Sequence, residues 1–134
     1  MIFVDTGAWF ALFVTKDINH GQAIDWLAKN RIKLLTTDYI IDELLTLLKA
    51  RGHTDTAIKI GEQFFVRQQH QIYYLNRDDI LESWKVFQQF NDKEWSFTDC
   101  TSKVIIEKLS IKSALAFDEH FKQFGTINIL PETQ

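Results

Sequence analysis

Short apolar runs alternate with longer stretches of helical periodicity along all 134 residues of the chain. The apolar runs predict strands at residues 2–5, 33–37, 72–75, 113–117 and 126–130. Apolar side chains recur at helical spacing in the segments between, which are residues 7–14, 20–30, 38–51, 54–70, 78–91, 97–109 and a short stretch near 119–124. Strands that alternate with helices predict an α/β fold with a parallel sheet. No linker or repeat interrupts the pattern, so we expect one domain over residues 1–134.

Polar residues mark the starts of several predicted helices. Side chains that can accept a backbone N–H stand before or within the first turn, and we expect Asp38, Thr54, Asp78 and Ser96 to be N-caps. Gly52 follows Lys49 and Arg51, the basic end of the third predicted helix.

Composition and charge limit the classes of function. The hydrophobic content of 46%, with 11 Phe and 4 Trp, is enough for a real core. The net charge of −3 gives no global basic field, so any contact with nucleic acid needs a local basic patch. A single cysteine, Cys100, excludes an intramolecular disulfide and fits a reducing compartment, which suggests the cytoplasm. We expect neither a signal peptide nor a membrane-spanning helix, because no suitable apolar segment occurs.

Acidic residues follow two of the predicted strands. Asp5 ends the apolar run at the start of the chain, and Asp118 follows the run at 113–117. A third acid, Asp99, falls in the first turn of the helix that Ser96 caps. Ligands of open α/β sheets bind beyond the carboxyl ends of the strands, where these acids are expected to lie.

A fourth acid lies in the helix predicted at 38–51. Ile40, Ile41 and Leu44 belong to its apolar stripe, and Glu43 lies on the flank of that stripe. Asp42 points away from the stripe and is expected to be solvated.

The four acids Asp5, Glu43, Asp99 and Asp118 could converge at the carboxyl edge of the sheet. Clustered carboxylates repel one another unless a cation neutralises them. Oxygen ligands suit Mg²⁺ or Mn²⁺, and such a metal can polarise a phosphoryl oxygen and activate water. This chemistry hydrolyses phosphodiesters.

The same residues resemble the PIN-domain family, and most of all its VapC-type toxin ribonucleases. The matching segments are the N-terminal run through Asp5-Thr6, the helix that carries Glu43, Phe97-Thr98-Asp99, and Ala116 to Phe121. Their order agrees over essentially the whole chain, and Cys100, where a small residue such as Ala is common, is a mild departure.

The resemblance implies a three-layer α/β/α fold around a parallel five-stranded sheet, with helices on both faces. It implies an endoribonuclease for single-stranded RNA that uses Mg²⁺ or Mn²⁺, as the toxin of a toxin–antitoxin pair. It also implies a homodimer and a small antitoxin partner. Asp5, Asp99 and Asp118 would hold the metal, and Glu43 would bind it or orient the attacking water. Thr6 and Thr98 match polar positions beside the acids.

Each acid also has an ordinary structural interpretation: a turn for Asp5, an exposed helix position for Glu43, a helix-dipole partner for Asp99 and a cap for Asp118. Lys49 and Arg51 are candidates for phosphate contact, although such residues are usually only solvated.

Other classes of site lack their signatures. The histidines have no zinc-ligand spacing with Cys100, and we expect His120 to be a surface or packing residue. No dinucleotide-binding, P-loop or serine-hydrolase motif is present. A dehalogenase-like phosphatase would need a second Asp where Gly7 stands. The alternative function is a non-catalytic PIN-fold module that binds RNA or a protein partner.

Overall fold

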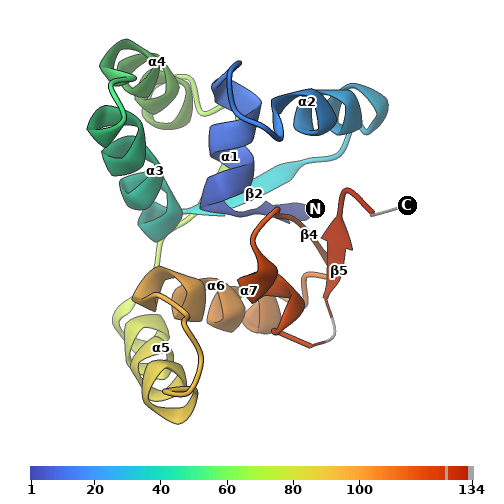
Figure 1. Cartoon of the computed structure of the whole chain (residues 1–134). Helices are drawn as coiled ribbons and strands as arrows, with labels where there is room; N and C mark the ends of the chain where they lie inside the picture. Colours follow the sequence, from blue (N-terminus) through green and yellow to red (C-terminus); the bar gives the residue numbers. More distant parts are fainter. Residues whose placement is uncertain (126, 133–134) are drawn as a thin grey trace.

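A computed structural model describes residues 1–125 and 127–132 and places a five-stranded sheet between two layers of helices (Figure 1). The sheet order is β3-β2-β1-β4-β5, and every neighbouring pair is parallel. The strands are β1 (Ile2–Val4), β2 (Leu34–Thr37), β3 (Gln71–Tyr73), β4 (Ser113–Leu115) and β5 (Asn128–Leu130). The predicted parallel α/β sheet is confirmed. The strand expected at 126–130 begins at a residue outside the described ones.

The helices cover the two faces of the sheet unequally. One group is α1 (Thr6–Phe13), α2 (His20–Lys29), α3 (Asp38–Ala50) and α4 (Thr54–Phe65), and the other is α5 (Arg77–Gln89), α6 (Phe97–Lys108) and α7 (Glu119–Lys122). The chain runs from β1 outward to β3 and then crosses back to β4 and β5. Right-handed crossovers in opposite directions put their helices on opposite faces, which gives the expected three layers (Figure 1).

Aromatic side chains fix the helices that surround the start of the chain. Phe3 of β1 is fully buried and packs against Phe121 of α7, with ring centroids 6.1 Å apart. On the other face, the ring of Trp9 in α1 meets Phe64 of α4 edge-on at 5.1 Å. β1 is therefore packed against α7 through Phe3, and α1, which follows it, is packed against α4.

Three of the predicted N-caps are wrong by one or two residues, and two of these precede α3 and α5. Thr37, not Asp38, caps α3, because its hydroxyl accepts the backbone N–H of Ile40 at 3.1 Å. The carboxylate of Asp38 instead accepts a backbone N–H 37 residues away, after β3. Asn76, not Asp78, caps α5. The cap of α6 by Ser96 is as predicted.

Helix α4 is shorter than its periodicity predicted and has a different cap. The N-cap position belongs to His53 rather than Thr54, and it makes no side-chain cap hydrogen bond. The helix ends at Phe65 instead of residue 70. Gln68 has a φ of 50°, a left-handed conformation that ends a helix, and the chain then turns into β3.

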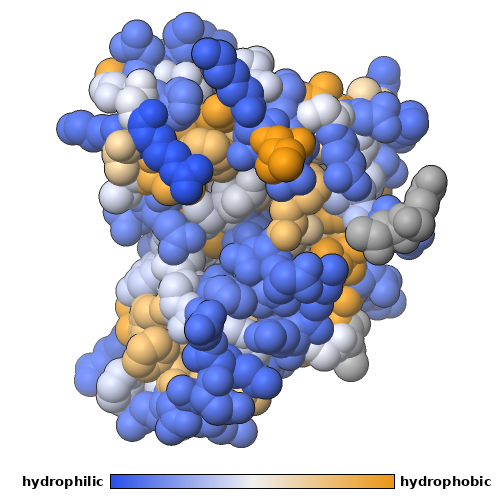
Figure 2. Space-filling view, in the orientation of Figure 1, coloured by the Kyte–Doolittle hydropathy of each residue, from blue (hydrophilic) through white to orange (hydrophobic). Residues whose placement is uncertain are grey.

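The surface facing the viewer in Figure 2 is mostly hydrophilic, and hydrophobic residues show through in separate patches. Among the described residues, no helix is long and apolar enough to cross a membrane.

Candidate functional site

Asp5 leaves the sheet at the carboxyl end of β1 and stands at the N-cap position of α1. Its backbone N–H still bonds to the carbonyl of Leu115 in β4, at 3.1 Å. Its side chain does not cap the helix, although it is only 5% exposed. A buried carboxylate that serves no cap is expensive to bury, which points to another role.

The other three predicted acids approach Asp5 from three different elements. Glu43 lies half-buried on α3, Asp99 lies buried in the first turn of α6, and Asp118 is the N-cap of α7. β4 is the direct neighbour of β1 in the sheet, so Asp118, three residues after β4, returns to the edge where Asp5 lies. In Figure 1 the lower ends of α1 and α3 meet α6 and α7 near the centre of the view.

The pKa of Asp5 reflects the three other acids. Burial, the largest effect, and then the negative charges of Asp99, Asp118 and Glu43 in that order together raise the pKa of Asp5 from 3.8 to about 8, against a hydrogen bond from the Thr6 backbone. No cationic side chain of the described residues is among the groups that shift this pKa. This surrounding of buried and negative groups therefore favours a proton or a cation at Asp5.

Asp99 is held by its own helix. Its Oδ2 accepts the backbone N–H of Ser96 at 2.9 Å, and its own backbone N–H donates to the Ser96 hydroxyl at 3.0 Å. This reciprocal capping box fixes the carboxylate at the start of α6. The conformation in which Asp99 stabilises the N-terminus of α6 is therefore also the one in which it would serve the predicted site, so its two predicted roles are compatible.

His120 lies beside two of these acids, where its sequence position predicted only a surface or packing residue. Its ring Nδ1 is 2.9 Å from Oδ2 of Asp99 and 3.4 Å from Oδ1 of Asp118. Its backbone N–H donates to the same Oδ1 of Asp118 at 2.9 Å. The sequence signal that could have found it is its place two residues after a strand-end acid, in the first turn of α7.

Thr6 adds an unsatisfied hydroxyl beside Asp5. It is 5% exposed, and its Oγ1 has no hydrogen-bond partner in the part of the chain that the structure describes. An unpaired buried hydroxyl costs about 1–3 kcal/mol, which a water or a phosphate oxygen would offset. Thr98, by contrast, lies half-buried in the first turn of α6 next to Asp99.

Lys49 and Arg51 lie at the opposite end of α3 from its N-terminal cap. Both are exposed, and the guanidinium of Arg51 lies 5.2 Å from the ring centroid of Phe10. Lys49 is six residues beyond Glu43, roughly 9 Å along the helix axis. The structure does not bring these two cations to the acids, so their contact with phosphate stays a prediction for RNA that extends beyond the four acids.

The donors fit a hard divalent cation in chemistry: carboxylate oxygens around a buried acid with no neighbouring positive charge. Over residues 1–125 and 127–132, however, no three His, Cys, Asp or Glu side chains lie close enough together to hold a metal ion. Coordination of one shared cation by the four acids therefore stays a prediction. Mutual repulsion of unneutralised carboxylates is sufficient reason for an open arrangement.

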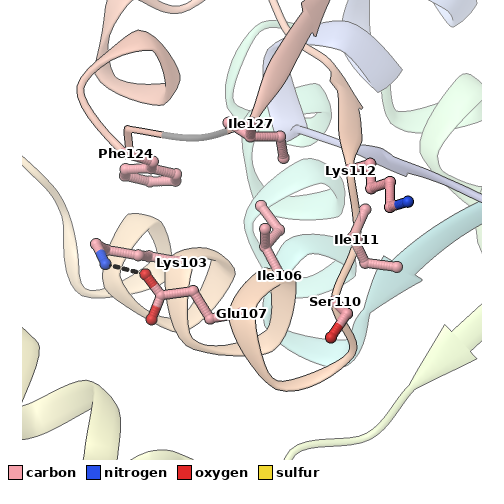
Figure 3. A pocket seen from close by; sticks show the side chains of 8 residues that line it. All are labelled: Lys103, Ile106, Glu107, Ser110, Ile111, Lys112, Phe124 and Ile127. Carbon is pink, nitrogen blue, oxygen red and sulfur yellow. Dashed lines mark hydrogen bonds and ion pairs between the residues drawn. The ribbon is translucent and has the colours of Figure 1, made fainter.

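A separate pocket of about 340 Å³ lies near the amino ends of β4 and β5 (Figure 3). Ile106, Ile111, Phe124 and Ile127 line it, and the Lys103–Glu107 ion pair lies on α6 beside it. Ile111 and Ile127 precede the amino ends of β4 and β5. This pocket is thus remote from the acids and contributes nothing to their chemistry.

Comparison with known proteins agrees with this geometry. Residues 2–127 match the PIN domain family. The chain belongs to the PIN domain family. The resemblance found in its sequence is confirmed.

Curated relatives of this PIN domain are named as nucleases. The 23S rRNA-specific endonuclease VapC20 of Mycobacterium tuberculosis, from strains CDC 1551 / Oshkosh and H37Rv, is 33% identical over 135 residues, covering 98% of this chain and 100% of that protein. A VapC ribonuclease of Archaeoglobus fulgidus is 29% identical over 124 residues, 88% of this chain and 77% of that one.

A solved structure confirms the likeness in three dimensions. The crystal structure of Mycobacterium tuberculosis VapC20, described as a toxin that cleaves the sarcin-ricin loop, superposes with a TM-score of 0.88 at 28% identity. The match covers 95% of this chain and 97% of that one. The three-layer α/β/α fold of this PIN domain is therefore the fold of a characterised toxin.

Proposed function

We propose that this PIN domain, as one unit over residues 1–134, is an endoribonuclease that needs Mg²⁺ or Mn²⁺ and cleaves single-stranded RNA. The observation that carries the proposal is Asp5, a buried carboxylate whose pKa is raised to about 8 by burial and by three other acids. If the four acids served only the stability of the fold, their burial and mutual repulsion at one sheet edge would be unfavourable and would bring no benefit. Their functional assignment rests on this arrangement and on the nuclease relatives.

Each candidate residue has a proposed role that depends on its position. Asp5, Asp99 and Asp118 would hold the cation, and Glu43, on the flank of α3, would hold it or orient the attacking water. When bound, the cation supplies neutralisation of phosphate charge and activation of water. The free hydroxyl of Thr6 is available to donate to a phosphate oxygen or to that water. Thr98, Lys49 and Arg51 would contact the RNA backbone along its path away from the four acids.

The activity can be tested with purified protein and end-labelled RNA. We expect cleavage with Mg²⁺ or Mn²⁺ and none after chelation, with a single-stranded RNA cut faster than its duplex. Cleavage that persists in chelator would contradict the metal requirement. Stable RNA binding without cleavage under any metal would instead support the non-catalytic alternative.

The target RNA is proposed from the relatives alone. VapC20 is named as specific for 23S rRNA and as cleaving the sarcin-ricin loop, and this chain matches it over nearly its full length. We therefore propose ribosomal RNA as the first substrate to test. Primer extension on ribosomes from host cells expressing the protein should show a single new 5′ end in 23S rRNA.

A role as toxin, acting in the cytoplasm with a small antitoxin as its partner, is proposed on the same similarity. Cationic antitoxin side chains could neutralise the four acids in place of the metal. Expression of the protein alone should stop growth, and co-expression with the product of the neighbouring short gene should restore it. Unimpaired growth with confirmed accumulation of folded protein would contradict the toxin role.

A homodimer is proposed as the working assembly. Leu81, Trp84 and Phe87 lie on α5 at 46%, 50% and 40% exposure, and the Trp84 and Phe87 rings stack at 6.0 Å. Such an exposed apolar surface is typical of an interface. Light scattering should give a mass twice that of a single chain, and Trp84→Asp should shift the measured mass toward that of a single chain.

A further inference from the structure

We propose that His120 is a positioning residue that orients the carboxylates of Asp99 and Asp118 for the cation, without being a ligand itself. The inference rests on the proposed metal site but goes beyond its four acids. It is carried by one ring nitrogen that faces two site acids from different helices, 2.9 Å from Asp99 and 3.4 Å from Asp118.

The hydrogen bonds occupy only one oxygen of each acid. Oδ2 of Asp99 accepts the Ser96 backbone N–H at 2.9 Å and also lies 2.9 Å from the ring Nδ1 of His120. Oδ1 of Asp118 accepts the His120 backbone N–H. No hydrogen bond within residues 1–125 and 127–132 involves Oδ1 of Asp99 or Oδ2 of Asp118. Each carboxylate therefore keeps one oxygen for a cation while the other fixes its rotation.

The position of the imidazole is itself fixed by packing. The next residue, Phe121, is fully buried and lies 6.1 Å from Phe3 and 4.7 Å from Phe124, measured between ring centroids. Phe3 lies on β1, two residues before Asp5. The short helix α7 is thus anchored to the strand that precedes Asp5, and His120 contacts Asp99 and Asp118 from that helix.

A positioning role predicts a specific loss. Groups that hydrogen-bond to metal ligands typically contribute about 10–100-fold to metal affinity. His120→Leu removes the ring donor, whereas His120→Asn keeps an N–H donor close to the position of Nδ1. Both variants retain the backbone N–H to Asp118. The two substitutions therefore separate the ring hydrogen bond from the presence of α7.

The test is Mn²⁺ binding to RNA-free protein, followed by electron paramagnetic resonance of the free ion. We expect His120→Leu to weaken Mn²⁺ binding about 10–100-fold and His120→Asn to stay within about threefold of the wild type. His53→Leu is the matched control, because His53 is half-buried beyond the C-terminal end of α3 and makes no side-chain cap bond. Equal Mn²⁺ affinity in His120→Leu and the wild type, or an equal loss in the Leu and Asn variants, would overturn the proposal.

A second measurement uses the wild type alone and covers the case in which His120→Leu does not fold. The ¹⁵N shifts of the His120 ring report which nitrogen is protonated, and the proposal requires a proton on Nδ1. A ring protonated only on Nε2 would overturn it. Because neither readout involves RNA, a protein that binds Mn²⁺ as expected but fails to cleave RNA would contradict the proposed nuclease and leave the role of His120 intact.

Discussion

Replacing Asp5 with Asn should stabilise the metal-free protein at neutral and alkaline pH. The native state holds the Asp5 carboxyl in a buried position among three other acids, and its pKa is raised from 3.8 to about 8. At pH values above 3.8, the Asp5 carboxyl ionises readily in the unfolded chain, whereas its ionisation is unfavourable in the native state. Asn keeps the size of the side chain and removes the charge.

The sign and size of the effect follow from proton linkage. Between pH 3.8 and about 8 the native state binds more protons at Asp5 than the unfolded state, so the free energy of unfolding falls as pH rises. Each unit by which the pKa differs between the native and unfolded states corresponds to about 1.36 kcal/mol in the free energy of unfolding. From pH 5 to pH 8 the wild type should therefore lose on the order of 3 kcal/mol through this group, and Asp5→Asn should lose none of it.

Urea unfolding in chelator at pH 5, 6.5 and 8 measures this directly. The difference between the two proteins cancels the titration of groups that do not interact with Asp5, such as His70, whose pKa is lowered by burial, and leaves Asp5 with the acids coupled to it. Asp42→Asn serves as the control, because Asp42 is an exposed acid on the same helix as Glu43. Parallel stability curves for the wild type and Asp5→Asn would show that Asp5 is not held as a strained, buried acid.

Three further outcomes are expected. Millimolar Mg²⁺ in thermal melts should raise the Tm of the wild type more than that of Asp5→Asn, because a ligand stabilises the state that binds it; equal shifts would contradict a site at Asp5. Ser96→Ala should lower the free energy of unfolding by about 1 kcal/mol in urea, through loss of the α6 cap, and an unchanged value would contradict the capping box. Asp79→Ala should lower it by roughly 2–4 kcal/mol, because Asp79 is 3% exposed and accepts from Tyr73, Lys108 and the Asn76 backbone. A loss below that of Ser96→Ala would show that this network is dispensable.

Local signals account for the features that were predictable from sequence. The alternation of short apolar runs with helical stretches determined the parallel sheet, and the sheet put Asp5 and Asp118 at the ends of neighbouring strands. The Ser96–Asp99 spacing predicted a cap that the structure contains. The flank position of Glu43 on α3 agrees with its half-buried side chain, and Asp42 is exposed as expected.

Features that depend on distant residues were not predictable. The ring of His120 bonds to an acid 21 positions earlier, and no local pattern encodes that contact. Asp38 looked like a cap because caps are often Asp, but its carboxylate bonds to the Leu75 backbone, 37 positions later. The Lys108–Tyr73 bond likewise joins the C-terminal end of α6 to β3, across 35 positions. Tertiary contacts of this kind override a local preference at each site.

If the four acids at one sheet edge act together on RNA, each of them is needed in single-turnover cleavage, which variants of the acids can measure. The set is Asp5→Asn, Glu43→Gln, Asp99→Asn and Asp118→Asn, with Asp42→Asn as the matched control, all at saturating Mn²⁺ and with folding checked by circular dichroism. We predict that each of the four folded variants loses at least about 100-fold in cleavage rate and that the control cleaves like the wild type. Wild-type cleavage by any folded variant of the four would contradict the assignment of that acid, and wild-type cleavage by Asp5→Asn would contradict the account as a whole.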